Sequence, residues 1–327
     1  MNTHARRMSQ GGQAGRLANL LAQDAVVQTP DESAIRGALD HLLSDRGVNV
    51  LAIAGGDGTV HHVINALLKR TEELRSVSHR EVPLPRVLVL NGGTLNIVGR
   101  SLSIHGRPYR TLARFLRYFD GAPLSRVPSV RLPLLSVGWA GGPRRYGFVF
   151  GSEVLYHAID LYMNFGAGYG GLGRFLFEFG RGVTVGSELW RRERWKLGPF
   201  EHRLEIDGRP FDRYCGVMAS TVDLALALRA VRAVRRAPLE PGFAVKLILE
   251  EDPWRLLTMV PRLMTDRRGA AVRDYPNAQQ MRLIGPYTLD GECFDEPAVT
   301  AERLALTVED SDWRLQAVPG RLGANRW

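Results

Sequence analysis

At 327 residues the chain is longer than one hydrophobic core usually supports, so we expect two domains. Hydrophobic residues make up 45% and charged residues 24% of the chain, as in a folded globular protein, and the net charge of +9 comes from 43 Lys and Arg against 34 Asp and Glu. No apolar run approaches the roughly 18 residues of a membrane span, and the polar N-terminus lacks the apolar core of a signal peptide, so we expect neither.

Residues 1–125 alternate helical and extended patterns, as a parallel sheet with crossover helices does. Apolar residues at helical spacing predict one helix over Gln13–Gln23 and a second over Asp31–Leu43. Short runs rich in Val, Ile and Leu are typical of buried parallel strands. The sequence therefore predicts an α/β domain over residues 1–125, with strands at 25–28, 48–54 and 86–90 and further helices at 61–69 and 109–119.

From residue 126 onward the chain consists mainly of short β-type runs separated by Gly and Pro. Two stretches interrupt them: 153–182, which we expect to be helical in parts, and 253–267, where apolar residues have helical spacing. This pattern predicts a mostly antiparallel β-sandwich domain over residues 126–327, with strands at 130–137, 145–150, 202–206, 215–220, 244–250, 280–283 and 304–309.

The strongest chemical signal is the segment Gly55-Gly56-Asp57-Gly58-Thr59, in which a buried strand runs into a glycine-rich turn and then a helix. Glycine permits a positive φ and a close approach of backbone N–H groups to an anion, and the N-terminus of a helix adds partial positive charge. The pattern indicates a phosphate site, although a tight strand-to-helix turn with Asp57 near a helix cap explains the spacing equally well. It is neither a Walker A loop nor a dinucleotide-binding fingerprint.

A second glycine-rich turn, Asn91-Gly92-Gly93-Thr94-Leu95-Asn96, follows the next predicted strand. Ligands of open α/β sheets bind beyond the carboxyl ends of the strands. We therefore expect the two turns to face one crevice.

Together these segments resemble the catalytic domain of diacylglycerol and sphingosine kinases, in particular the bacterial lipid kinases with an NAD-kinase-like first domain. The matching segments are Gly55–Thr59, Gly93–Asn96 and, far downstream, Asp290-Gly291-Glu292. Their order and spacing agree with that family. The resemblance implies an NAD-kinase-like α/β nucleotide-binding domain followed by a β-rich lipid-substrate domain, with the active site in the cleft between them.

The resemblance also implies the chemistry, which is ATP- and Mg²⁺-dependent phosphorylation of a hydroxyl of a lipid such as diacylglycerol or a sphingoid base. Glu292 matches the family's proton acceptor, Asp57 is its rival for that role, and Asp290 is a further catalytic candidate. A hairpin turn is the structural alternative for Asp290-Gly291. By resemblance the nucleotide is held by Thr29, Gly55, Gly56, Asp57, Gly58, Thr59, Thr94 and Asn96.

Several positions depart from the family pattern. His61-His62 replaces a polar Asn-Glu pair, and we expect these histidines to face solvent or phosphate; Ile97 stands where the family has an aspartate. The magnesium-binding loop has no clear counterpart, the nearest stretch being Pro238–Gly242, so no metal ligand is assigned. An apolar first strand is also missing, and Asn2–Arg6 is its candidate remnant. Two alternatives stay open: a nucleotide-binding relative with lost or altered kinase activity, and a kinase of a nucleotide such as NAD.

The chain also offers features for binding lipid. Residues 146–179 contain ten of the 27 Phe, Tyr and Trp residues, which would line an acyl-chain pocket or pack a core. Arginine supplies all cations except three lysines, a total that we interpret as codon usage, with local clusters of interest at 191–194 and 229–236. The first cluster, interleaved with Trp, suits an anionic membrane surface.

The remaining expectations concern partners and location. Cys215 and Cys293 form no CxxC pair, which indicates a reducing cytoplasm, and a lipid kinase there would bind peripherally to the inner face of the membrane. We expect no nucleic-acid binding, because no recognised module is present. A homodimer is compatible with the resemblance.

Overall fold

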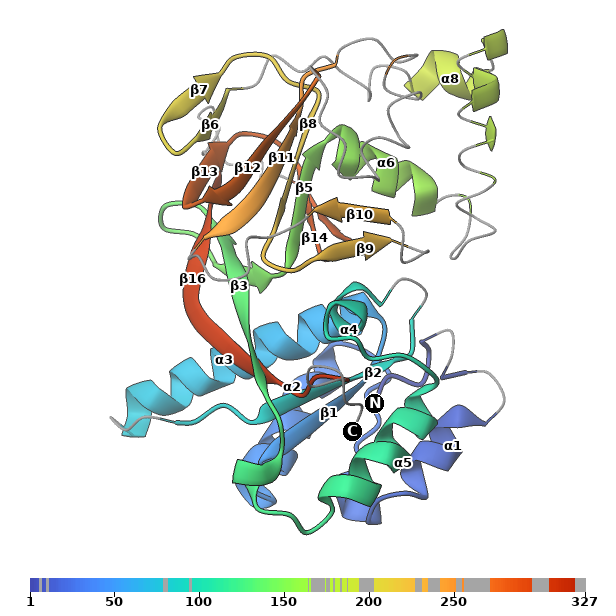
Figure 1. The fold of residues 1–327 in the computed structure, drawn as a ribbon, viewed down its shortest axis with the longest axis vertical. Helices are drawn as coiled ribbons and strands as arrows, with labels where there is room; N and C mark the ends of the chain where they lie inside the picture. The colour runs from blue at the N-terminus through green and yellow to red at the C-terminus, as the bar shows by residue number, and fades with distance from the viewer. Residues whose placement is uncertain are drawn as a thin grey trace. The chain divides into compact units, whose positions relative to one another are not determined.

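The chain folds into two compact units, which are described separately below (Figure 1). The first unit comprises Met1–Leu132 and Trp313–Trp327, and the second comprises Pro133–Asp312. The computed structural model describes residues 1–5, 8–9, 12–78, 82–93, 96–163, 165, 174, 177–178, 180–182, 184–186, 188–193, 203–226, 231–234, 242–250, 255, 271–295 and 306–320.

A parallel sheet forms the centre of the first unit. Strand β1 (Val50–Gly55) pairs with β2 (Arg86–Asn91) from Val50↔Arg86 to Gly55↔Asn91, and the crossover between them contains helix α3 (Asp57–Ser78). On the other side of β2, Ala317 at the end of β16 (Leu306–Ala317) pairs in parallel with Val87. The α/β fold class expected for this part of the chain is confirmed.

The first two residues of the chain lie at the opposite edge of this sheet, next to β1. Asn2 N donates a hydrogen bond to Ala54 O at 2.9 Å, and Thr29 N donates one to Met1 O, also at 2.9 Å. Met1 and Asn2 therefore lie between β1 and the segment at 27–29. The strand predicted at 25–28 is replaced by a short 3-10 helix at Gln23–Ala25 followed by extended chain.

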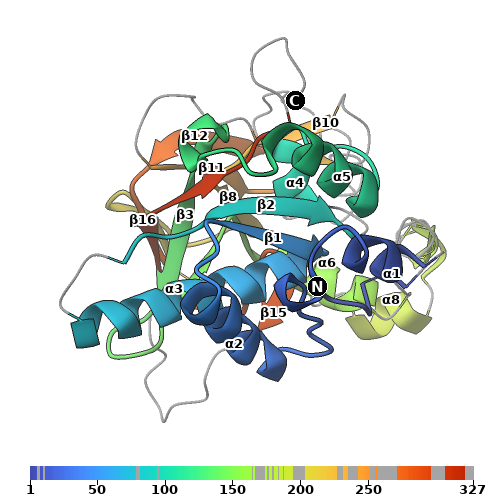
Figure 2. The same ribbon diagram turned by 90° about the horizontal axis from the view of Figure 1, so that it is seen from below.

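Helices cover both faces of the sheet, as Figure 2 shows: α4 and α5 lie on one face, and α2 and α3 on the other. Helix α3 places Val60, Ile64, Leu67 and Leu68 on its buried side, at the spacing of an amphipathic helix. The other helices of this unit are α1 (Gln13–Ala18), α2 (Ser33–Asp40, continued by a π-helical turn at His41–Asp45), α4 (Ile97–Ser101) and α5 (Pro108–Phe119).

The second unit is a β-sandwich, as expected. One of its sheets has the strand order β12-β11-β8-β5-β14-β15, and the other contains β16, β13, β6 and β7 together with β3 and β4. The core residues between them include Leu135, Tyr214, Phe243, Leu283 and Tyr287. The strands are β3 (Val130–Gly138), β4 (Arg145–Gly147), β5 (Val149–Glu153), β6 (Leu204–Ile206), β7 (Arg209–Phe211), β8 (Gly216–Ser220), β9 (Leu224–Leu226), β10 (Val231–Val234), β11 (Phe243–Ile248), β12 (Val272–Ala278), β13 (Gln280–Leu283), β14 (Tyr287–Leu289) and β15 (Glu292–Phe294).

This unit also contains the helices α6 (Val154–Met163) and α8 (Glu188–Glu193). Both fall in the first stretch predicted to interrupt the strands or just after it. The helix predicted at 253–267 lies outside the described residues except for Arg255. In the described parts of the chain no helix combines the length and the apolar character that a bilayer span requires.

The division between the units differs from the boundary expected after residue 125. The chain leaves the first unit at Leu132, within β3, and re-enters it at Trp313, within β16. The sequence does not show that the chain returns to the first unit, because the return occurs inside β16, one continuous strand of 12 residues. The C-terminal end of β16 is held in the first unit by burial and stacking. Leu315 and Ala317 are buried, and the Arg75 guanidinium lies 4.8 Å from the centre of the Trp313 ring.

Candidate active site

The two glycine-rich turns of the first unit touch each other. Gly92 N donates a hydrogen bond to Gly55 O at 2.7 Å. A Cβ atom on Gly93 would lie 2.5 Å from Gly56 Cα, and one on Gly92 would lie 3.0 Å from Gly55 Cα. None of these four glycines has a positive φ, so the conformational freedom that we expected glycine to supply here is not what the turns use. They use the absence of a side chain, because two backbones meet.

Helix α3 begins directly at the first turn. Its first hydrogen bond runs from Val60 N to Gly56 O at 3.0 Å, so the N–H groups of residues 57–59 precede the helical ladder. Residues 56–59 are half-buried. The sequence motif thus coincides with the partially positive end of a 22-residue helix, an arrangement suited to binding an anion.

Thr59 lies one turn into the helix and folds back over the glycines. A Cβ atom on Gly55 would lie 2.4 Å from Thr59 Cβ. The Thr59 hydroxyl accepts a hydrogen bond from Asn2 Nδ2 at 2.9 Å. Thr29, another predicted nucleotide residue, is buried and is joined to the same edge of the sheet because its N–H donates to Met1 O.

Asp57 and Asn96 brace the second turn. The Asp57 carboxylate accepts a hydrogen bond from Ile97 N at 2.7 Å, which holds the first residue of α4. Asn96 has a left-handed backbone (φ 50) and binds Gly93 twice, accepting from Gly93 N at 2.9 Å and donating to Gly93 O at 2.8 Å. Position 97 therefore contributes through its backbone, and its side chain differs from that of the family without breaking this bracing. Thr94, the remaining predicted nucleotide residue, lies outside the described residues.

Of the two histidines after the first turn, which we expected to face solvent or phosphate, His61 does not face solvent, because its exposure is only 4%. His61 lies on the same side of α3 as Ile64 and Leu68, because residues three and seven apart share a helix face. His62 is half-exposed, and its Nδ1 lies 3.3 Å from Glu32 Oε1.

In the second unit the Asp290-Gly291 pair forms the turn of a hairpin between β14 and β15, as its structural alternative predicted. Both residues have a positive φ, 55 and 91, as a two-residue turn of the type I′ family requires. The Asp290 carboxylate accepts hydrogen bonds from Phe148 N at 2.8 Å and Val149 N at 2.9 Å. Asp290 thus attaches the hairpin to the segment between β4 and β5.

Glu292 is the first residue of β15, half-buried and directly opposite Leu289. The next residue reports on its surroundings: burial, followed by the nearby carboxylates of Asp160, Glu292 and Asp295, raises the pKa of Cys293 to about 11. Asp160 comes from α6, which also supplies Tyr156, whose hydroxyl donates to Asp295. Sequence reasoning missed Tyr156, Asp160 and Asp295; the i, i+4 spacing of the first two on a helix was the available signal.

Among the residues that the structure describes, no group of three or more His, Cys, Asp or Glu side chains is arranged to hold an ion. In the stretch considered for the family's magnesium loop only Gly242 is described.

We predict opposite effects of adding a methyl group to two different glycines of the first unit. Gly93→Ala should destabilise the protein by about 1–3 kcal/mol, because the new Cβ meets Gly56 Cα. Gly37→Ala, in α2 with no atom within 4 Å, should be neutral or stabilise by up to about 1 kcal/mol. Urea unfolding measures both; equal stability of the two variants would contradict the close approach of the turns.

We also predict that the two carboxylates of the hairpin differ in their effect on stability. Asp290→Ala removes the acceptor of two backbone N–H groups and should cost about 1–3 kcal/mol. Glu292→Gln keeps the shape of a half-buried edge residue and should change stability by less than about 0.5 kcal/mol. Thermal unfolding of the two variants tests this, and a loss of stability in Glu292→Gln as large as in Asp290→Ala would show that Glu292 is structural too.

Part of the chain is similar to a known protein family. Residues 7–118 match the profile of the diacylglycerol kinase catalytic domain, and the matched range includes both glycine-rich turns. Comparison with curated proteins gives no significant match.

The fold is found in solved structures. A diacylglycerol kinase from Bacillus anthracis str. Sterne has a TM-score of 0.59 at 11% identity, and a candidate diacylglycerol kinase from the same organism has a TM-score of 0.62 at 13% identity. Each alignment covers 97% of this chain and 94% of the other. The resemblance to the diacylglycerol kinase catalytic-domain family is therefore confirmed, by sequence over residues 7–118 and by fold over nearly the whole chain.

Proposed function

We propose that the protein is an ATP-dependent lipid kinase that phosphorylates a hydroxyl of a lipid such as diacylglycerol or a sphingoid base. The observation that carries the proposal is the pair of touching glycine turns at the N-terminus of α3, within the range that matches a kinase catalytic domain. Phosphoryl transfer demands mainly positioning and charge stabilisation, and a backbone cradle at a helix terminus provides both.

On the nucleotide side, the N–H groups at the start of α3 would receive phosphate oxygens, and the Asn96 and Asp57 hydrogen bonds would keep the second turn in place beside them. Mg²⁺ binds proteins through one or two carboxylates together with substrate phosphates, so the single carboxylate of Asp57 fits it. When bound, the ion would neutralise the charge on the phosphate oxygens.

On the acceptor side, Glu292 would orient the attacking hydroxyl and take its proton. A carboxylate suits this task because it accepts a hydrogen bond from the hydroxyl before transfer and the proton after it. Asp290 would act indirectly, since its own carboxylate is bound to two backbone N–H groups and fixes the hairpin that begins β15.

A relative with lost or altered activity is the second candidate. It is favoured by one contact: the Asp57 carboxylate is hydrogen-bonded to Ile97 N, a bracing role that needs no catalysis.

Transfer of labelled phosphate from ATP to extracted cell lipids, with products identified by mass spectrometry, distinguishes the candidates. We predict that the wild-type protein labels a lipid, that Asp57→Ala and Glu292→Gln each lower the rate at least about 100-fold, and that Glu205→Gln, a half-buried glutamate of β6, leaves it unchanged. ATP binding without transfer to any lipid supports the second candidate, transfer to NAD supports a nucleotide kinase, and wild-type rates in both site variants would remove the assigned roles.

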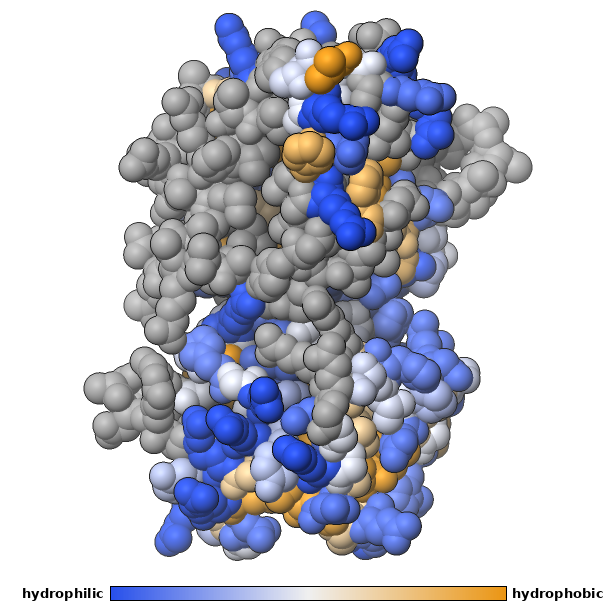
Figure 3. All heavy atoms as spheres, turned by 90° about the vertical axis from the view of Figure 1, so that its right-hand side faces the viewer, coloured by the Kyte–Doolittle hydropathy of each residue, from blue (hydrophilic) through white to orange (hydrophobic). Residues whose placement is uncertain are grey.

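We further propose that the region around α8 binds an anionic membrane surface. In this part of the chain Phe177 and Val185 are 67% and 77% exposed, and Arg181, Arg191 and Arg192 are exposed as well. Figure 3 shows strongly hydrophobic and hydrophilic residues next to each other on the side that carries α8. Exposed apolar side chains flanked by arginine suit an interface between headgroups and water.

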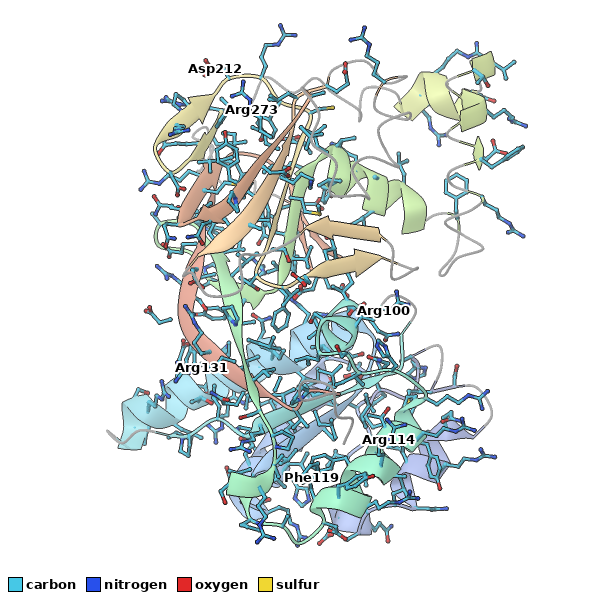
Figure 4. All side chains as sticks on the ribbon, viewed as in Figure 1. Arg100, Arg114, Phe119, Arg131, Asp212 and Arg273 are labelled. Atoms are coloured by element: carbon cyan, nitrogen blue, oxygen red, sulfur yellow. The ribbon has the colours of Figure 1, made fainter. Side chains whose placement is uncertain are left out.

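The other arginines are spread widely. Arg100, Arg114, Arg131 and Arg273, labelled in Figure 4, belong to α4, α5, β3 and β12. Their spread agrees with the interpretation that the total positive charge reflects amino-acid composition. Binding to a membrane would therefore depend on a local cluster of arginines and not on the net charge.

The membrane proposal predicts that replacing Arg191 and Arg192 together by Ala weakens binding to phosphatidylserine-containing vesicles by about 1 kcal/mol per residue at low salt. The matched control replaces Arg114 and Arg117, two exposed arginines of α5, and should bind as the wild type does. Vesicle co-sedimentation measures this binding. Equal binding of the two double variants would show that Arg191 and Arg192 have no special role at the membrane.

A further inference from the structure

A row of stacked side chains crosses three strands of the second unit and ends in an arginine. The Phe150 and Tyr287 rings stack at 5.6 Å, and the Tyr287 and Phe294 rings stack at 5.2 Å. The Arg145 guanidinium lies 4.5 Å from the centre of the Phe294 ring and 6.0 Å from that of Trp139. Arg145 Nη1 also donates a hydrogen bond to the Tyr287 hydroxyl at 3.1 Å. The guanidinium is therefore held in place by three aromatic residues.

Arg145 has no acidic partner in the parts of the chain that the structure describes, since its contacts are those to the aromatic side chains. The neighbouring Arg144 differs: it is paired with Glu309 at 3.2 Å. A guanidinium carries five N–H donors, and Arg145 uses one of them within the described protein. It is also half-exposed, so a ligand can reach the others.

The register of the hairpin places this arginine near Glu292. Tyr287 lies directly opposite Phe294, and Leu289 lies directly opposite Glu292. Side chains alternate along a strand, so Glu292 and Phe294 share one face of β15, about 7 Å apart, while Cys293 points to the other face. Arg145 lies on the Phe294 ring and therefore on the face of the edge strand that carries Glu292.

We propose that Arg145 is a specificity-determining residue that binds an anionic oxygen group, phosphate or carboxylate, next to the acceptor hydroxyl. The inference rests on the proposed function only in placing that hydroxyl at Glu292. A preoriented guanidinium binds phosphate and carboxylate through two parallel hydrogen bonds. The same charge disfavours an acceptor with a protonated amine, so among the two lipid classes considered it favours a glycerolipid over a sphingoid base.

Two sources would supply this anionic group. One is a headgroup of the acceptor lipid itself, and the other is the phosphoryl group being transferred. Both place a phosphate oxygen beside the guanidinium, and only substrate comparison separates them.

Direct binding of short-chain lipids to the full chain tests the inference without any catalysis. The probes are dioctanoyl phosphatidate and dioctanoylglycerol, which differ only in the phosphate, titrated in a calorimeter. Arg145→Met keeps packing volume against Phe294 and removes the charge, so it should weaken phosphatidate binding about tenfold and leave dioctanoylglycerol binding unchanged. Arg144→Ala, the matched control, should change neither. Unchanged phosphatidate binding in Arg145→Met, or an equal loss for both lipids, overturns the proposal.

Transfer kinetics with diacylglycerol and phosphatidylglycerol as acceptors then identify the source. If the anion is the acceptor's headgroup, Arg145→Met raises KM for phosphatidylglycerol alone; if it is the transferred phosphoryl group, kcat falls equally with both acceptors. Kinetics unchanged with both acceptors place no anion at Arg145 during turnover and overturn its role in specificity. If the wild-type protein phosphorylates no lipid, the proposed function fails, while the binding experiment still decides whether Arg145 binds phosphate.

Discussion

The first unit depends on a place where two backbones meet without side chains between them. Gly55, the last residue of β1, and Gly56 touch Gly92 and Gly93, which follow β2, and a methyl group added at Gly93 would come within 2.5 Å of a backbone atom. The contact is possible only because neighbouring parallel strands end at the same edge of the sheet in matched register, Gly55 opposite Asn91. It brings two turns and the start of α3 into one structure with a half-buried row of backbone N–H groups.

Polar residues of the motifs mostly hold these turns in shape. Asp57 binds the first N–H of α4, Asn96 binds both polar groups of Gly93, and Asp290 binds two N–H groups beside β5 in the other unit. Each of these side chains pairs backbone N–H or C=O groups in an irregular segment, where no helix or strand supplies their hydrogen bonds. Glu292 differs from these residues because it lies half-buried on an edge strand, next to a thiol, Cys293, whose pKa is raised by burial and then by nearby carboxylates. This contrast separates residues that build a site from the one proposed to do chemistry in it.

The region around the hairpin contains charges of both signs. Burial, followed by Asp160, Glu292 and Asp295, raises the pKa of Cys293, whereas the aromatic row holds Arg145 on the face of β15 that carries Glu292 and Phe294. Aromatic rings hold a guanidinium without neutralising it, because their attraction to it arises from the ring quadrupole. A positive charge kept available in this way is what an anionic substrate group would need.

Residue patterns predicted the fold class, the strands that lead into the glycine turns and the helix that follows the first turn, and they offered the hairpin turn at Asp290-Gly291 as an alternative, because each depends on residues close together in the chain. Hydrophobic periodicity and turn-forming residues determine local structure, so helices, strands and turns can be predicted from them without a structure. Only the folded structure shows that Met1 and Asn2 lie beside β1, that Trp313–Trp327 returns to the first unit, and that His61 is buried. It also decided that the glycines serve close approach instead of positive φ, and that Arg145 stacks on a ring 149 positions later in the chain, Phe294. These outcomes depend on contacts between distant segments, which no local pattern of residues specifies.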